Sequence, residues 1–111
     1  MKNTISFQDF QKIDIRIGTI IKVNGFPKAR KPAYQITIDF GEIGVKKTSA
    51  QITALYTKEA LLNKQVLAII NFKPKQIANF MSECLILGIQ DGEKVTLLKS
   101  SKKVKNGTIV S

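Results

Sequence analysis

The chain of 111 residues contains no histidine, no tryptophan and only one cysteine, Cys84. Without histidine it has no Ser-His or Cys-His nucleophile pair, and it lacks the commonest general base and a frequent zinc ligand. One cysteine cannot form an internal disulfide, and Cys84 lies in an apolar run, where cysteine is usually a small buried hydrophobic residue. We therefore expect no catalytic residues, no metal site and no cofactor, and we expect a cytoplasmic location.

Long apolar runs are also missing. No run approaches the roughly 18 residues that a membrane helix needs, and the segment after Met1 has no apolar signal-peptide core. The length fits one domain of about 100–150 residues, and the hydrophobic content of 43% is that of a globular protein. These features predict one domain over residues 1–111 that does not insert into a membrane.

Negative charge is scarce. Eight Asp and Glu residues against 18 Lys and Arg residues leave a net charge of +10. Such an excess favours an anionic partner, and nucleic acid before a membrane surface. A surface coated with solvated lysines and without a ligand is the alternative, and only the positions of the lysines can separate the two.

Strand patterns dominate what is present. From Ile13 to Val23 the apolar residues Ile13, Ile15, Ile17, Ile21 and Val23 share one parity, which predicts a long, half-buried strand. Gly18 in its middle indicates a bulge or a sharp bend, as a corner of a small closed barrel requires.

Four more barrel strands and one additional short strand are expected along the chain. Apolar and polar residues alternate without exception from Tyr34 to Phe40, and Val45–Ser49 follows as a hairpin partner after a turn bracketed by glycines. Apolar runs then predict strands at about 65–72 and 82–89, and residues 95–98 form a further short strand.

Helical signals are confined to two short stretches. Ser6 resembles the N-cap of a first helix, and residues 51–63 combine helical spacing with a second cap at Thr57. Near the end, Asn106-Gly107 predicts a two-residue hairpin between Val104 and Ile109.

Five short strands with a helix between the third and the fourth predict an all-β fold, namely a five-stranded Greek-key barrel of the OB type. It would have a short N-terminal helix and extra C-terminal strands. In OB folds one sheet face and the loops after strands 1 and 4 usually bind the ligand. Seven of the 18 cations fall at those positions: Lys28, Arg30, Lys31, Lys46, Lys47, Lys73 and Lys75.

Apolar side chains accompany the cations in the two loops. Bases could stack on Phe26 and Phe80, whereas Phe80 and Met81 could equally cap the barrel end or fill an interface that receives peptide. Both alternatives stay open. A second basic cluster is expected to be a solvated hairpin face: Lys99, Lys102, Lys103 and Lys105.

In the fourth and fifth strands, apolar residues occupy odd and even positions alike, at Val66–Ile70 and Cys84–Leu87. A barrel strand with one solvated face should alternate, so another surface must cover the outer side. The N-terminal helix could cover part of it, and a symmetric partner could cover the rest. We therefore expect a homodimer.

Several motifs resemble the tRNA-binding OB-domain family. The opening "DIRIG" is similar to the signature of that family, which also occurs appended to methionyl- and phenylalanyl-tRNA synthetases. In order and spacing, "FPKARKPAYQITIDFG", "SAQIT", "NFKPKQIANFMSE" and "NGT" are more similar still to the CsaA-type export-related chaperones. The resemblance covers nearly the whole chain, from about Phe10 to Ile109.

The resemblance implies a homodimer with a basic surface for tRNA or tRNA-like RNA. It also implies a chaperone that binds unfolded preproteins and delivers them to the secretion machinery; the alternative is a tRNA-binding protein without a chaperone role. The residues it assigns to RNA are Lys73, Lys75, Asn79 and Ser82, with Arg30 and Lys31 opposite, beside which the charge pattern places Lys28 and Lys46.

Three segments depart from the family pattern, and one of them is Ala50-Gln51-Ile52, where tRNA-binding relatives tend to have a glycine. Cys84-Leu85 stands where tRNA-binding relatives usually have Gly-Met, and Asn79 stands where they usually have glycine. Asparagine tolerates a positive φ better than most residues, so we expect Asn79 to keep the turn. Together these departures favour the chaperone-type branch.

Overall fold

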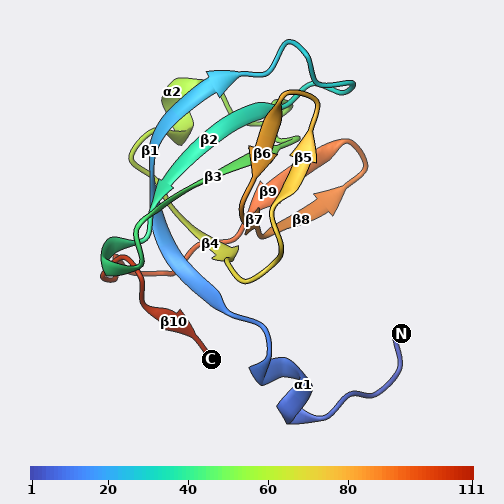
Figure 1. The fold of residues 1–111 in the computed structure, drawn as a ribbon, viewed down its shortest axis with the longest axis vertical. Helices are drawn as coiled ribbons and strands as arrows, with labels where there is room; N and C mark the ends of the chain where they lie inside the picture. The colour runs from blue at the N-terminus through green and yellow to red at the C-terminus, as the bar shows by residue number, and fades with distance from the viewer.

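A strongly curved antiparallel sheet winds into a nearly closed barrel in the computed structural model, which describes all residues from 1 to 111 (Figure 1). The strand order is β3-β2-β1-β4-β7. The strands span β1 Ile15–Gly25, β2 Tyr34–Asp39, β3 Val45–Ala50, β4 Gln65–Ile69 and β7 Leu85–Ile86. The barrel closes where the Glu83 N–H donates to the Lys47 carbonyl at 2.7 Å. The predicted all-β OB barrel is confirmed.

Alternation along β2 fills the core. Ile36, Ile38 and Phe40 are fully buried, and Val66 and Ala68 of β4 meet them from across the barrel. On β1, however, Ile20 is fully buried and Ile21 is 46% exposed. The predicted core position of Ile21 is wrong, because Gly18 and Ile20 face the core and Ile21 therefore points to the other side; the register shift between Ile20 and Lys22 then returns Val23 to the core.

Gly18 allows β1 and β2 to approach closely. The bulge expected at Gly18 lies further along β1, where the register shifts. A Cβ atom at Gly18 would lie 2.5 Å from Ile38 Cγ2 and 2.7 Å from Phe40 Cδ1. Only a residue without a side chain allows β1 to pass this closely over the core of β2.

The two helices start where their caps predict. Helix α1, Phe7–Gln11, has a capping box between Ser6 and Asp9, and α2, Lys58–Leu61, starts after Thr57. The prediction of a helix over residues 51–56 is wrong. That segment forms turns instead, since Ile52 enters the core and the Tyr56 carbonyl accepts a hydrogen bond from the Tyr34 hydroxyl at 2.7 Å.

Residues 71–83, expected as a loop, form an antiparallel hairpin of β5, Lys75–Ile77, and β6, Phe80–Ser82. The expected strand over 82–89 is divided, because Cys84 is drawn into the core between β6 and β7. A further hairpin follows, formed by β8, Gly88–Asp91, and β9, Lys94–Leu97. These interruptions change the direction of the chain where it reaches the rim of the barrel, a place where strands commonly bend.

The C-terminal segment joins β1 instead of folding on itself. Strand β10, Ile109–Val110, pairs antiparallel with the start of β1, so the predicted hairpin between Val104 and Ile109 is wrong. Asn106-Gly107 still forms a turn, with Gly107 at φ +89°, and the Gly107 N–H donates to the Ile17 carbonyl at 2.7 Å. Long-range pairing with β1 thus outcompetes the local hairpin.

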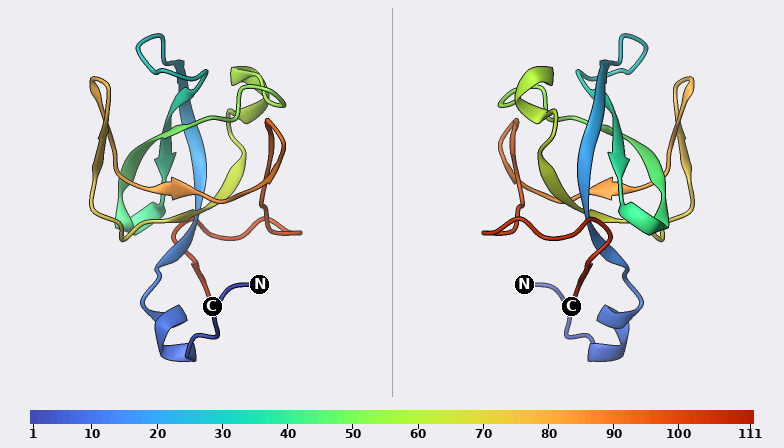
Figure 2. Two further views of the ribbon diagram at one scale, coloured as in Figure 1. Left: turned by 90° about the vertical axis from the view of Figure 1, so that its right-hand side faces the viewer. Right: turned by 90° about the vertical axis from the view of Figure 1, so that its left-hand side faces the viewer.

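Helix α1 and β10 project together from one end of the barrel (Figures 1 and 2). We call residues 1–14 the N-terminal arm. It buries none of its helix residues, and Ile5, Phe7 and Ile13 are 64%, 71% and 39% exposed. No helix of the fold has the length and apolar character to cross a membrane.

We expect Gly18→Ala to destabilise the fold by about 1–3 kcal/mol, because the added methyl group overpacks Ile38 and Phe40. Urea denaturation followed by circular dichroism measures the change. Gly25→Ala is the matched control in the same strand, since its Cβ would meet only the flexible end of Lys58 at 3.7 Å. The control should stay within about 0.5 kcal/mol of the wild type; equal stability of the two variants would contradict this account of Gly18.

Candidate nucleic-acid interface

Two basic segments lie at the same end of the barrel, opposite the N-terminal arm (Figure 2). One is the loop between β1 and β2, and the other is the β5–β6 hairpin. The Phe26 and Phe80 rings join them, with centroids 5.5 Å apart at an angle of 59°. Such a tilted aromatic contact stabilises the pair beyond simple burial. We call this joined surface the loop–hairpin face; its exposed cations are Lys28, Arg30, Lys31, Lys73 and Lys75.

The cations of the loop–hairpin face have no carboxylate partners. The chain contains two ion pairs, Lys12 with Asp9 at 3.3 Å and Arg16 with Asp14 at 2.6 Å, and neither lies on this face. The positive charges of the face are therefore not neutralised within the protein. Unpaired cations on one surface attract a polyanion at long range and release counterions when it binds.

Ser82 anchors the hairpin to the barrel. Its hydroxyl lies 3.1 Å from the Thr48 hydroxyl and accepts a hydrogen bond from the Ser49 N–H at 3.3 Å. Thr48 is itself buried and donates to the Cys84 carbonyl at 2.7 Å. The Ser82 hydroxyl thus points toward β3, and its visible role is to position β6.

The turn at the tip of the β5–β6 hairpin contains a residue with a positive φ angle. Ala78 adopts φ +52°, whereas Asn79, at which a positive φ was expected, does not. The side-chain amide of Gln76 supports the turn by donating to the Ala78 carbonyl at 3.2 Å. Asn79 is exposed at the tip, so its side chain is free to meet a ligand.

The apolar residues of the two loops differ in access. Phe26 is only 6% exposed, so its ring is occupied by packing, and Phe80 is half-buried against it. Met81 is 49% exposed on the opposite side of β6. Lys46 is half-buried on β3, outside both loops, and its charge acts on Cys84.

A groove of about 670 Å³ runs beside the loop–hairpin face. Its polar edge includes Lys31, Gln90 and Glu93, and its apolar wall comes from the end of β3, the hairpin β5–β6, β7 and β9. The apolar residues are Ile52, Ile77, Leu85, Ile86, Val95 and Leu97. An apolar wall next to unpaired cations suits a ligand with an extended apolar part.

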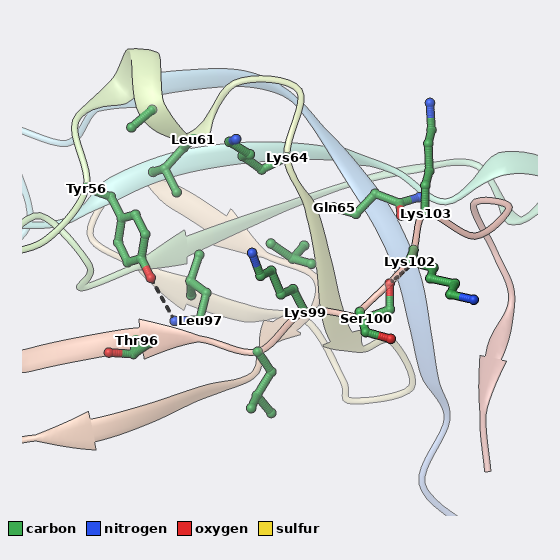
Figure 3. A pocket seen from close by; sticks show the side chains of 14 residues that line it. Tyr56, Leu61, Lys64, Gln65, Thr96, Leu97, Lys99, Ser100, Lys102 and Lys103 are labelled. Atoms are coloured by element: carbon green, nitrogen blue, oxygen red, sulfur yellow. Dashed lines mark hydrogen bonds between the residues drawn. The ribbon is translucent and has the colours of Figure 1, made fainter.

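The C-terminal lysines do not form the expected hairpin face. Lys99, Lys102 and Lys103 follow β9 and line a second cavity of about 520 Å³, on the other side of the barrel from β5–β6 (Figures 2 and 3). Lys64, just before β4, joins them there. Sequence reasoning missed this grouping because residues 64 and 99 meet only through the packing of β9 against the barrel.

Cys84 has the properties of a core residue. Burial raises the pKa of its thiol to about 11, an effect that the nearby Lys46 charge partly opposes. The side chain is therefore a neutral thiol at physiological pH and a poor nucleophile. No three His, Cys, Asp or Glu side chains lie close enough to share a metal ion.

Comparison with known proteins agrees with this geometry. Residues 15–109 match the family model described as "Putative tRNA binding domain". Methionine--tRNA ligase of Pyrococcus furiosus is 39% identical over 106 residues, which are 96% of this chain and 14% of that ligase. The chain thus spans 14% of the length of this relative.

Two solved structures are similar over their full length. The chaperone CsaA from Bacillus anthracis str. Ames has a TM-score of 0.93 at 44% identity, covering 98% of this chain and 100% of that one. The CsaA chaperone protein from Picrophilus torridus has a TM-score of 0.92 at 49% identity, covering 97% and 100%. The chain therefore belongs to the tRNA-binding domain family, and CsaA chaperones are among its structural neighbours.

Proposed function

We propose that residues 1–111 act as one tRNA-binding OB domain that works in the cytoplasm as a homodimer. Each subunit binds tRNA or tRNA-like RNA on the loop–hairpin face. The dimer also binds unfolded preproteins and passes them to the secretion machinery. The proposal unites the family match with the similarity to the CsaA chaperones.

The contact between Phe26 and Phe80 carries the RNA part of the proposal. It holds the β1–β2 loop against the β5–β6 hairpin, so that cations distant in the sequence act as one surface. Lys28, Arg30, Lys31, Lys73 and Lys75 would contact phosphates, and the exposed tip at Asn79 would reach a base or ribose. Ser82 contributes by fixing the hairpin on β3.

The groove beside this face supports the polypeptide part. Its apolar wall could take the side chains of an extended, unfolded segment, which a folded protein keeps inside. Leu85 is 47% exposed in that wall, and Met81 is 49% exposed nearby on β6. Lys46 lies at the junction of β3 with this region and would be a peripheral contact of either ligand.

Exposed apolar residues on the N-terminal arm support the homodimer. Ile5, Phe7 and Ile13 are exposed on a segment that packs little against its own barrel, and Ile109 of β10 is 53% exposed beside it. Such an arm gains apolar burial when it docks on a second subunit. The two-fold symmetry of a dimer would bury both arms by the same contacts.

A tRNA-binding protein without a chaperone role is the alternative. The similarity to a part of methionine--tRNA ligase favours it, because that relative is named for a tRNA-dependent activity. The two functions differ in the ligand that the apolar groove takes, and the experiments below separate them.

We expect Lys73→Glu/Lys75→Glu to weaken tRNA binding by about tenfold or more and to make the log–log salt dependence shallower by about two. Fluorescence anisotropy with labelled tRNA at several salt concentrations measures both. Lys2→Glu/Lys12→Glu is the control, since it makes the same change of charge on the N-terminal arm at the other end of the barrel. Equal losses in both variants would show that net charge alone, and not the loop–hairpin face, governs binding.

Phe7→Asp should convert the dimer into monomers, because a charge at this position cannot be buried in an interface without a partner. Sedimentation equilibrium of the wild type should give the mass of two chains, and that of the variant the mass of one. Leu55→Asp, at a site that is 45% exposed before α2, should leave the dimer intact. A wild-type protein of one chain would refute the homodimer.

The wild type should suppress the aggregation of a chemically unfolded protein at one dimer per chain, with little dependence on salt, because apolar burial drives the contact. Light scattering during dilution from denaturant measures this. Leu85→Asp should lose the suppression and keep tRNA binding, while Leu55→Asp should keep both. If the wild type itself has no effect at this ratio, the chaperone part fails and the alternative function remains.

A further inference from the structure

The cavity on the far side of the barrel is enclosed by elements that are distant in the sequence. Helix α2, the start of β4 and the chain that follows β9 surround a volume of about 520 Å³ (Figure 3). This size lies within the range of about 300–1,000 Å³ that small-molecule sites occupy. The loop–hairpin face contributes no residue to it.

Positive charge surrounds the cavity without any negative charge. Lys64 and Lys99 come from different walls, whereas the side chains of Lys102 and Lys103 extend away from the cavity (Figure 3). None of the lining residues is acidic, and none of these lysines belongs to an ion pair. The ammonium groups of Lys64 and Lys99 have no carboxylate partner, and an anion between them would be attracted by both.

The inner wall of the cavity is apolar. Leu61 and Val66 are each 1% exposed and form its base, and Leu97 adds a half-buried side chain. An inorganic ion alone would leave the exposed part of Leu97 in contact with water. The wall therefore favours a ligand that combines an anionic group with a body of several ring atoms.

Tyr56 adds a hydrogen-bond donor whose position is fixed. Its hydroxyl oxygen accepts from the Leu97 N–H at 3.0 Å (Figure 3). Its carbonyl accepts from the Tyr34 hydroxyl at 2.7 Å. The proton of the Tyr56 hydroxyl is donated to no other protein atom. It is thus available for an acceptor oxygen of a ligand.

Gln65 holds the basic wall in place before any ligand arrives. Its side-chain amide donates to the Val104 carbonyl at 2.6 Å and to Asn106 Oδ1 at 3.1 Å, and its oxygen accepts from the Val104 N–H at 3.2 Å. These bonds tie the chain after Lys103 to β4. A site that is ordered in advance loses less entropy on binding.

We infer that this cavity is a nucleotide site that binds a nucleoside monophosphate, separate from the loop–hairpin face. The phosphate lies between Lys64 and Lys99 and accepts from the Tyr56 hydroxyl, while the base and ribose pack on the half-buried Leu97. A phosphomonoester carries about −1.5 to −2 charges at pH 7, which suits two inward ammonium groups. The nucleotide could be free or could be an unpaired residue of an RNA, and both sources share this chemistry.

Titration of the ¹⁵N-labelled wild type with 5′-AMP tests the site. The amide resonances of Leu97, Leu98 and Ser100 should shift and saturate, while those of Lys75–Ser82 should not move. Lys99→Glu should weaken AMP binding by roughly tenfold, the effect of losing one charge-assisted contact. Lys2→Glu carries the same change of charge on the N-terminal arm and should bind AMP as the wild type does.

Ala60→Trp tests the cavity without changing its charge. Ala60 is exposed on α2 and lines the cavity, so a large side chain there should block AMP and leave the fold intact. Binding of AMP to this variant with unchanged affinity would overturn the inference. The inference would also be overturned if AMP caused no resonance shifts in the wild type. It would be overturned as well if inorganic phosphate bound with the same affinity as AMP, because the apolar wall would then contribute nothing. Binding of laurate in place of AMP would also overturn it, since the site would then take a fatty acid.

A labelled hexamer of adenylate distinguishes the two sources of the nucleotide. If Ala60→Trp weakens hexamer binding, the cavity takes an unpaired residue of RNA; if only AMP binding falls, it takes the free nucleotide. Lys73→Glu/Lys75→Glu should keep AMP binding whatever happens to tRNA. The nucleotide site and the proposed function can therefore fail independently.

Discussion

The close passage of β1 over β2 at Gly18 is the constraint on which the other features depend. Because no side chain separates Gly18 from Ile38 and Phe40, β1 can bend tightly enough to pair with β2 along one half and with β4 along the other. Its first residues also bind β10. One strand thus holds the barrel, the C-terminal segment and the attachment of the N-terminal arm in a single arrangement.

The basic end of the barrel relies on contacts that reach across the sheet. Ser82 and Glu83 fasten the base of the β5–β6 hairpin to β3 by hydrogen bonds, and Phe80 fastens its upper part to Phe26 in the β1–β2 loop. The hairpin is therefore held at two points, although it pairs with no barrel strand. A rigid scaffold under exposed lysines lowers the entropy that those side chains lose on binding a polyanion.

Charge and apolar surface are divided between the parts of this small barrel. Cations without carboxylate partners collect on the loop–hairpin face and around the cavity behind α2, whereas exposed apolar residues collect on the N-terminal arm and the groove wall. The division would let one chain of this size offer separate surfaces to the RNA, the second subunit and the unfolded polypeptide of the proposed function. Binding at the basic surfaces should then weaken with salt, and binding at the apolar ones should not.

Local patterns were sufficient wherever neighbours in the sequence decide the structure. The alternation of β2, the caps at Ser6 and Thr57, and the basic loop after β1 all followed from residue types and their spacing. Ile21 could not be placed in this way, because only the packing of Gly18 and Ile20 against β2 decides which side of β1 faces the core. The hairpin expected between Val104 and Ile109 gave way to β10 for the same kind of reason.

The sequence by itself determined a basic OB barrel, because alternation, turn residues and charge are local properties of the chain, and its motifs carried the resemblance to the tRNA-binding family. Only the tertiary structure decided that Phe26 is buried under Phe80, that the Ser82 hydroxyl faces β3, and that Lys64 and Lys99 share a cavity. These are contacts between residues far apart in the chain, and burial and partner distances exist only after the strands have paired.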